Sequence, residues 1–147
     1  MSLMELLTAD MKAAMKQGEK ARLSVIRLVR GAVRQEEIDG KKTLNDDEII
    51  NVIAKEVKMR RDSIEEFERG KRADLVEKTK AEIDILTSYL PAQLSLDEVK
   101  QIAEKAVAEV GAATTKDMGK VMSVLMPRIK GRADGKLVNE IVRSLLK

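Results

Sequence analysis

The chain has 147 residues, with 28 Lys or Arg against 25 Asp or Glu, so its net charge is +3 at pH 7. It contains no cysteine, histidine or tryptophan. These absences exclude thiol nucleophiles, disulfides, metal sites built from Cys or His, and imidazole acid-base catalysis. Phe67 and Tyr89 are the only aromatic residues, so the core must consist of Leu, Ile, Val, Met and Ala, a composition that favours helices.

Targeting and membrane signals are missing from the sequence. The longest apolar run is far shorter than the ~20 residues that span a bilayer, and no basic region followed by an apolar block comes after Met1. The lack of cysteine is compatible with a reducing compartment. We therefore expect a soluble, cytoplasmic protein that uses no membrane, no metal and no cofactor.

Capping residues and glycines divide the first 90 residues into four helices. Ser2 with Glu5 and Asn45 with Glu48 have capping-box spacing, and each precedes an apolar stripe of helical period. Glycines at 18, 40 and 70 are expected to stop the first three helices, and Pro91 prevents the fourth from continuing. The expected helices cover about 3–17, 19–38, 45–70 and 72–90.

A second helical unit is predicted after this proline. Residues 91–94 read as a linker, and Ser95 with Glu98 starts a new capping box. Three helices follow, over 96–110, about 116–130 and from Asp134, which is a good N-cap. No strand-like alternation occurs. The sequence thus predicts an all-α protein with an N-terminal helical domain over 1–90, a linker over 91–94, and a C-terminal three-helix bundle over 95–147.

Positive charge is concentrated near the C-terminus. Residues 1–90 contain 18 basic and 18 acidic side chains, whereas residues 111–147 contain eight basic and three acidic ones, a net charge of +5. On the sixth helix Gly119, Ser123 and Pro127 are four residues apart, opposite the apolar stripe. Such a smooth face can approach phosphates, or it can let another helix pack closely. The proposed nucleic-acid contacts are Lys116, Gly119, Lys120, Ser123, Lys130, Arg132 and Lys136.

Two further basic features lie in the N-terminal domain. A secondary basic stripe falls within roughly 80° on the second helix and comprises Lys20, Arg27, Arg30 and Arg34. Acidic partners on a neighbouring helix would neutralise it, and without interleaved aromatics it offers no base-stacking platform. Arg60 falls on the apolar face of the third helix, where it needs either a carboxylate partner, a solvent-exposed end, or a ligand or RNA contact.

Signatures of catalysis are absent. There is no phosphate-binding loop, nucleophile elbow or dinucleotide fingerprint. Adjacent carboxylates such as Asp46 and Asp47 point away from each other on a helix and are typical of caps and solvated faces. The sequence therefore indicates no catalytic residue.

Three stretches carry a resemblance to a known family: RRDSIEEF at 60–67, YLPAQLS at 89–95, and the run from DMGKVM at 117–122 through MP at 126–127 to KGRADG at 130–135. On these residues the chain resembles the YqeY-like family. The last stretch is also similar to the tail domain of the B subunit of glutamine-dependent tRNA amidotransferase. That tail commonly has proline where this chain has Gly135.

The resemblance implies an all-helical protein with an N-terminal helical unit and a C-terminal three-helix bundle, and for the amidotransferase subunit it implies that the tail engages tRNA. In the amidotransferase another domain performs the ATP-dependent activation, and this chain has no counterpart of it. The leading hypothesis is a non-catalytic module that binds tRNA, or a tRNA-handling complex, through the basic bundle. A second hypothesis is a protein adaptor that docks a partner with the long third and fourth helices. A third is an accessory component of a carbon-nitrogen ligase that takes its amido group from glutamine.

Overall fold

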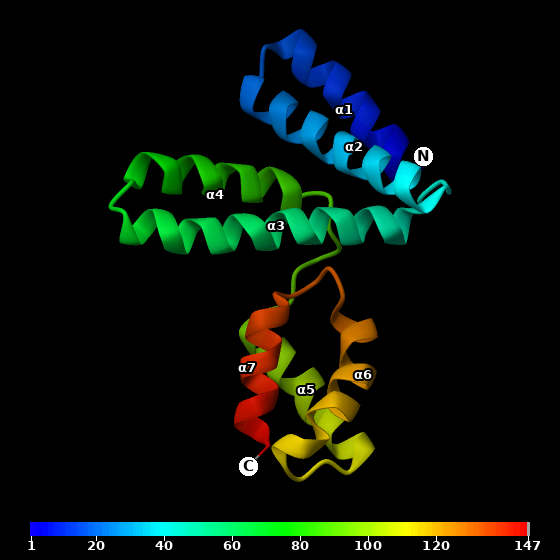
Figure 1. The fold of residues 1–147 in the computed structure, drawn as a ribbon, viewed down its shortest axis with the longest axis vertical. Coiled ribbons are helices and arrows are strands. Elements are labelled where there is room, and N and C mark those ends of the chain that lie inside the picture. Colours follow the sequence, from blue (N-terminus) through cyan, green and yellow to red (C-terminus); the bar gives the residue numbers. More distant parts are fainter. Residues whose placement is uncertain (147) are drawn as a thin grey trace. The chain divides into compact units, whose positions relative to one another are not determined.

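The computed structural model describes residues 1–146, and these residues confirm the all-α prediction, because they form seven α-helices and no strand. The chain groups into two compact units, Met1–Leu90 and the residues from Pro91 onward (Figure 1). Within residues 1–146 no helix has both the length and the apolar character that a membrane crossing requires. The α-helices are α1 (Leu3–Gln17), α2 (Lys20–Gly40), α3 (Asp46–Arg69), α4 (Ala73–Thr87), α5 (Leu96–Val110), α6 (Met118–Ile129) and α7 (Gly135–Leu145), with a 3-10 turn at Thr115–Asp117 before α6.

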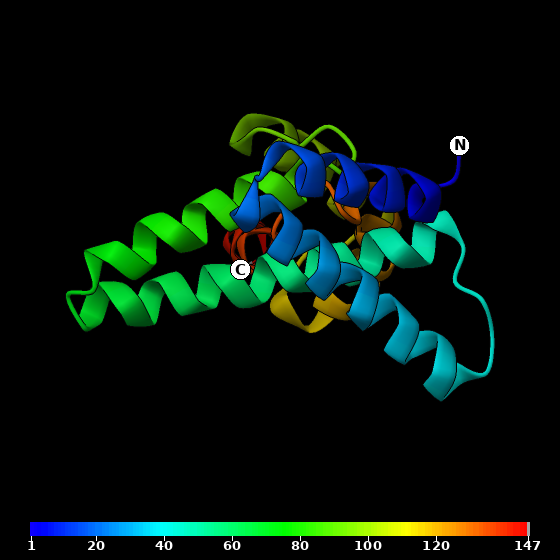
Figure 2. The same cartoon turned by 90° about the horizontal axis from the view of Figure 1, so that it is seen from above.

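The first unit consists of two helical hairpins. α1 packs beside α2, α3 packs beside α4, and α2 crosses α3 and also contacts α4 (Figure 2). The core lies where the hairpins cross, and aliphatic side chains fill it. Its fully buried members include Leu7, Ile26, Ile53 and Leu86, one from each helix.

The α3–α4 hairpin extends beyond this core. The core residues of α3 end at Val57, and beyond that point α4 contributes only Val76 and Thr79 to the buried set. The free end of the hairpin therefore projects from the unit, as Figure 2 shows on the side opposite the α2–α3 loop. A long helical hairpin with a small core of its own presents much of its surface to solvent.

The second unit is a three-helix cluster with a separate core. Val99, Val121, Leu125 and Val138 are completely buried in it. Residues 91–94 are hydrogen-bonded to the turn between α6 and α7. The Leu94 N–H donates to the Arg132 carbonyl oxygen at 2.8 Å, and the Gln93 amide donates to the Gly131 carbonyl oxygen at 2.8 Å. The stretch predicted as a linker thus has hydrogen-bond partners in this unit.

Most helix ends follow their sequence signals. Both reciprocal hydrogen bonds of the capping box form at Asn45 and at Ser95. Gly18 and Gly111 take the left-handed conformation that ends α1 and α5, with φ of 69° and 66°.

Four details of the helix prediction were wrong. Ser2 accepts a hydrogen bond from the Glu5 N–H, but the return bond of a capping box is not formed. The left-handed residue after α2 is Lys41, with φ of 51°, so the helix runs through Gly40. α4 ends at Thr87 rather than at residue 90, because a turn precedes Pro91. The sixth helix starts at Met118, since the residues before it form the 3-10 turn.

Candidate nucleic-acid interface

The small-residue face of α6 is open in the structure. Gly119, Ser123 and Pro127 are all exposed, and a Cβ atom placed on Gly119 would meet no atom within 4 Å. The Ser123 hydroxyl donates to the Gly119 carbonyl oxygen at 2.9 Å, so it is held flat against its own helix. Within residues 1–146 these small residues therefore do not serve to pack a second helix, which was the alternative interpretation.

Three lysines border this face. Lys116 lies in the 3-10 turn, Lys120 in the first turn of α6 and Lys130 at its C-terminal end, and all three are exposed. In the described part of the chain none of them lies within 4 Å of a carboxylate oxygen. Their charges are consequently available to an external anion.

Asp117 stays ionised close to these lysines. The backbone N–H groups of Ala113 and Thr114 donate to its carboxylate at 3.1 and 3.4 Å, and these bonds lower the pKa of Asp117, with a smaller contribution from the charge of Lys120. The carboxylate thus caps the turn before α6. It also reduces the local positive potential around Lys120.

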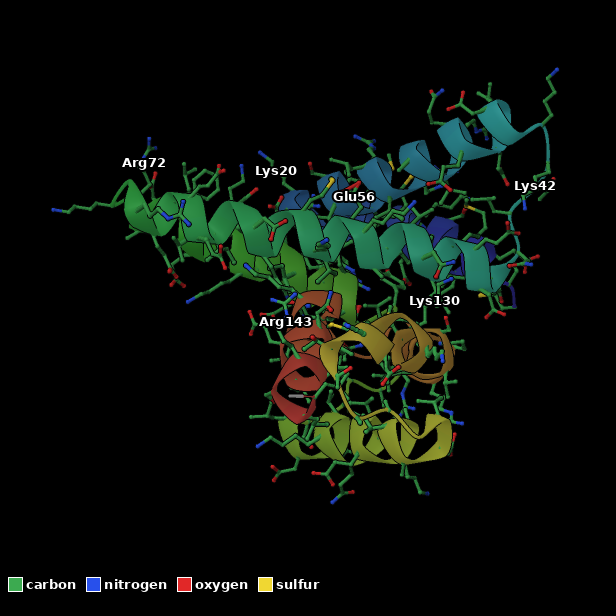
Figure 3. All side chains as sticks on the ribbon, turned by 60° about the horizontal axis from the view of Figure 1, so that its bottom comes forward. Lys20, Lys42, Glu56, Arg72, Lys130 and Arg143 are labelled. Atoms are coloured by element: carbon green, nitrogen blue, oxygen red, sulfur yellow. The ribbon has the colours of Figure 1, made fainter. Side chains whose placement is uncertain are left out.

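Of the two remaining predicted contacts, Lys136 is exposed, whereas Arg132 is engaged by the protein itself. The Arg132 Nε donates to the Ala92 carbonyl oxygen at 3.3 Å, so this arginine helps to hold the segment before α5. Asp134 caps α7 by accepting from the Lys136 N–H at 3.2 Å, and a carboxylate therefore already occupies this helix start. Arg128, on the C-terminal turn of α6, is paired with Glu109 at 2.7 Å. Figure 3 shows Lys130 and Arg143 on different helices of this unit, so its basic residues do not form one row.

The secondary basic stripe divides into two parts. Lys20 lies at the start of α2, where it is exposed. Arg27, Arg30 and Arg34 lie along the middle of the helix and line one groove together with the N-terminal ends of α1 and α3. Helical periodicity predicted the row, but it did not indicate the groove, because the opposite walls come from other helices and from the α2–α3 loop.

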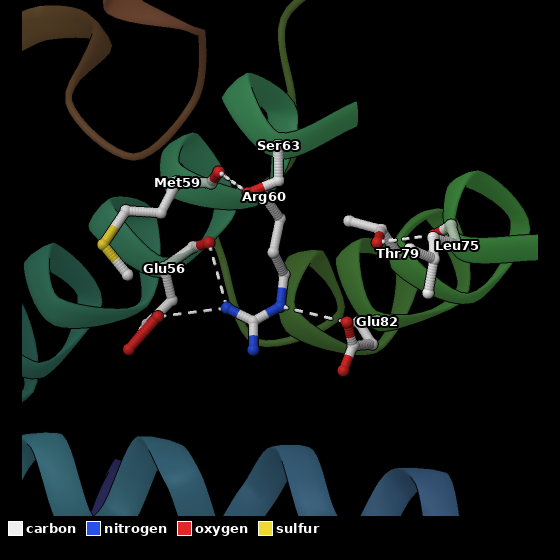
Figure 4. Close-up of polar contacts among 7 residues, drawn as sticks. All are labelled: Glu56, Met59, Arg60, Ser63, Leu75, Thr79 and Glu82. Atoms are coloured by element: carbon white, nitrogen blue, oxygen red, sulfur yellow. Dashed lines mark hydrogen bonds and ion pairs between the residues drawn. The ribbon is translucent and has the colours of Figure 1, made fainter. Parts of the chain in front are cut away.

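Arg60 is paired with two carboxylates. Its Nη1 donates to Glu56 Oε2 at 3.0 Å and to the Glu56 carbonyl oxygen at 3.1 Å, and its Nε lies 3.6 Å from Glu82 Oε1 (Figure 4). The side chains of Arg60, Glu56 and Glu82 are 12, 10 and 24% exposed. Of the interpretations open for Arg60, the structure shows the paired one, in which the arginine joins α3 to α4.

Acidic side chains form no metal-binding group in the described residues, where no three of them converge. Carboxylates are instead used in caps and ion pairs, such as Glu48, which accepts from Lys42 and from the Asn45 N–H. These contacts lower the pKa of Glu48. These carboxylates therefore have structural roles.

Comparison with known proteins places the whole chain in one group. A sequence model of the family described as "Yqey-like protein" matches residues 4–146. The chain is also similar to proteins named "Altered inheritance of mitochondria protein 41, mitochondrial". With the one from Pyrenophora tritici-repentis it shares 33% identity over 146 residues, 95% of this chain and 78% of that protein. With the one from Kluyveromyces lactis it shares 42% identity over 87 residues, 58% of this chain and 47% of that protein.

A third relative of the same name, from Saccharomyces cerevisiae (strain YJM789), is 33% identical over 113 residues, 72% of this chain and 61% of that protein. The match thus spans about half to three quarters of these relatives. Their names contradict the predicted cytoplasmic location and point to a mitochondrial one. The prediction rested on the lack of cysteine and of an apolar span, and neither property distinguishes the cytoplasm from the interior of a mitochondrion.

Proposed function

This chain belongs to the YqeY-like family, and on that premise we propose that it is a non-catalytic helical module that binds tRNA, or a tRNA-handling complex, through its basic second unit. The observation that carries the proposal is the open face of Gly119, Ser123 and Pro127 with unpaired lysines at its borders. Small side chains let a sugar-phosphate backbone approach a helix closely, and lysines supply point charges for the phosphates.

The chemistry of this face favours shape recognition over base recognition. The second unit contains no aromatic residue, so it lacks the aromatic platform on which most sequence-specific RNA-binding modules stack unpaired bases. Phosphate contacts dominate in that situation, and each neutralised phosphate contributes a slope of about 0.7–0.9 to the fall of log affinity with log salt. If each of the three lysines neutralises one phosphate, the salt slope is about 2–3.

The test is a titration of fluorescently labelled tRNA with the full chain at several salt concentrations. Lys120→Ala and Lys130→Ala are each expected to reduce affinity several-fold and to lower the salt slope by about 1. Lys80→Ala is a matched control, since Lys80 is exposed on α4 in the other unit. Unchanged affinity and slope in both Lys120 and Lys130 variants would show that this face does not bind RNA.

A protein-adaptor function is the second candidate, and the projecting end of the α3–α4 hairpin favours it. Met59 is 56% exposed on α3 and Leu28, on α2, is 46% exposed. Both line a shallow depression of about 410 Å³ that also contains Phe67 and Leu75. Exposed apolar side chains around a depression are typical of surfaces that bind another protein.

Nuclease treatment separates the two functions. A complex captured by the full chain that survives nuclease, and that Met59→Glu disrupts while Lys120→Ala does not, would support the adaptor. Loss of capture on nuclease treatment would support RNA binding.

A further inference from the structure

A groove in the first unit has a wall of basic residues. The RNA-binding function proposed for the second unit does not use this wall. Its volume is about 930 Å³, within the usual range for small-molecule sites of roughly 300–1,000 Å³. One wall is residues 27–37 of α2, and the others are the N-terminal ends of α1 and α3 and the loop before α3. Its lining includes three arginines, Arg27, Arg30 and Arg34, and two carboxylates, Glu37 and Asp46.

The arginines of this wall are not neutralised by the protein. Arg27 and Arg34 are exposed, and neither makes an ion pair or hydrogen bond with the described residues. The three residues 27, 30 and 34 lie on one side of α2 and extend over about 10 Å at 1.5 Å per residue. Three uncompensated guanidinium groups in one groove repel one another and attract anions.

Arg30 is the most informative of the three. Its Nη1 contacts only the Met11 thioether sulfur, at 3.0 Å, and its Nε is buried without a hydrogen-bond partner. A sulfur atom is a weak acceptor, and a buried charged donor without a good acceptor is costly. The Nη groups of Arg30 have only this sulfur as a partner in the described residues, so they remain available for an acceptor that is not part of the chain.

The two carboxylates of the groove are already engaged by backbone groups. Glu37 Oε2 accepts from the Leu44 N–H at 2.9 Å, and Asp46 Oδ1 accepts from the Leu3 N–H at 3.0 Å. These bonds hold the α2–α3 loop and the start of α1 in place as walls of the groove. The carboxylates form no ion pair with the arginines, and Gly31, between Arg30 and Arg34, leaves open space.

We propose that this groove is a binding site for a chain of phosphate groups. Guanidinium forks bind phosphate oxygens in pairs, and a row of about 10 Å matches two or three consecutive phosphates. Met4, Leu44 and Ile49 give the groove an apolar part beside the arginines, where the remainder of a nucleotide-sized ligand fits. A free di- or triphosphate and a short single strand of RNA present the same chemistry to this wall.

The site is tested with the full chain by calorimetric titration of tripolyphosphate, and by fluorescence anisotropy with a labelled single-stranded oligonucleotide. The double variant Arg27→Gln/Arg34→Gln is expected to weaken binding at least tenfold, and it should fold normally because both side chains are exposed. Arg30→Gln is expected to weaken it similarly, with its melting temperature measured in parallel. Arg69→Gln is the matched control, since Arg69 is an exposed arginine at the other end of α3.

Each outcome has a defined meaning. Saturable tripolyphosphate binding that the double variant loses identifies a free phosphate ligand, and oligonucleotide binding alone, lost in the same variant, identifies a strand. No saturable binding of either probe, or an equal loss in Arg69→Gln, overturns the proposal. The tripolyphosphate titration of the Arg27→Gln/Arg34→Gln variant probes the groove of the first unit alone, so its failure is distinguishable from a failure of the RNA-binding test of the second unit.

Discussion

Arg60 shows how a charged residue is accommodated on an apolar helix face. Periodicity places it among the apolar side chains of α3, and that much follows from the sequence. Its partner Glu56 lies four residues away on the same helix, so the sequence spacing indicates this pair. The pair with Glu82 joins α3 to α4, so it depends on how the two helices of the hairpin align. Local spacing predicts contacts within one helix, but contacts between helices require the packing geometry.

We expect Arg60→Ala to lower the free energy of unfolding by about 3 kcal/mol, because it leaves the poorly exposed Glu56 carboxylate without its main partner. The double change Glu56→Leu/Arg60→Met should restore most of this loss, since it removes both charges and keeps their volume. Urea denaturation of the two variants measures the difference. A double variant as unstable as Arg60→Ala would show that packing, rather than charge, dominates at this position.

Tyr89 is joined to both helices of the first hairpin. Its hydroxyl donates to Asp10 Oδ2 at 2.6 Å, and Arg22 lies 3.6 Å from the same oxygen. Burial, followed by the hydrogen bond to Asp10, raises the pKa of Tyr89 to about 12, and the nearby Arg22 opposes this shift. The hydroxyl therefore keeps its proton well above the ordinary tyrosine pKa of about 10.

This raised pKa predicts a loss of stability in alkali. Between about pH 10 and pH 12 the unfolded chain loses the Tyr89 proton while the folded chain retains it, so the free energy of unfolding falls as pH rises. Below pH 10 both states are protonated and this contribution is constant. Denaturation of the wild type and of Tyr89→Phe across pH 9–12 measures it. The variant should start about 1 kcal/mol lower, from the lost hydrogen bond, and show a smaller fall. Parallel curves would contradict this assignment.

At the scale of the element, the helices were largely predictable from capping residues. Asn45 and Ser95 act through hydrogen bonds within three residues, so their effect is local and can be predicted from the sequence. The end of α2 is an exception, because no capping pattern in the sequence marks it. α2 continues through Gly40 because Lys41 takes the left-handed conformation, and its N–H bonds the carbonyl oxygens of Glu37 and Ile38.

Replacing this lysine tests the helix end. Lys41→Gly is expected to raise the free energy of unfolding by about 0.5–1 kcal/mol, because a left-handed lysine is strained and glycine is not. Gly40→Ala should not destabilise, since Gly40 is helical. Gly18→Ala serves as the contrasting control and should destabilise, because Gly18 has φ of 69°. If Gly40→Ala proved as harmful as Gly18→Ala, α2 would end one residue earlier than described here.

Binding surfaces were harder to predict than helices. The row of arginines on α2 and the small-residue face of α6 both follow from the period of about 100° per residue. Their availability does not, because it depends on which side chains neighbouring helices bring. Arg132 shows the limit: charge counting grouped it with the lysines of the second unit, yet it is used to hold Ala92.

At the scale of the whole molecule, the independence of the two units stays a prediction. Each has its own buried cluster, and small helical units of this size fold alone when their core is complete. Because residues 91–94 are hydrogen-bonded to the second unit, a fragment of this unit should begin at residue 91. Leu94 also packs against its core, which gives these residues an apolar contribution.

We therefore expect a fragment of residues 91–147 to unfold cooperatively with helical circular dichroism. A fragment of residues 95–147 should be less stable by about 2 kcal/mol, from the lost Leu94 side chain and its backbone hydrogen bond. Thermal denaturation of both fragments gives the comparison. Equal melting temperatures would show that residues 91–94 contribute nothing, and a non-cooperative transition in both would show that the second unit requires the first.

The contact between Tyr89 and Asp10 also gives the protein a spectroscopic property. The chain has a single tyrosine and no tryptophan, so its intrinsic ultraviolet fluorescence comes almost entirely from one phenol ring. That ring belongs to the first unit, and its emission is sensitive to the carboxylate that accepts its hydrogen bond. Native tyrosine emission therefore reports unfolding of the first unit, whereas helical dichroism follows the helices of both units, so a dichroism change without an emission change reports the second unit. The two transitions can be recorded separately in the unlabelled protein.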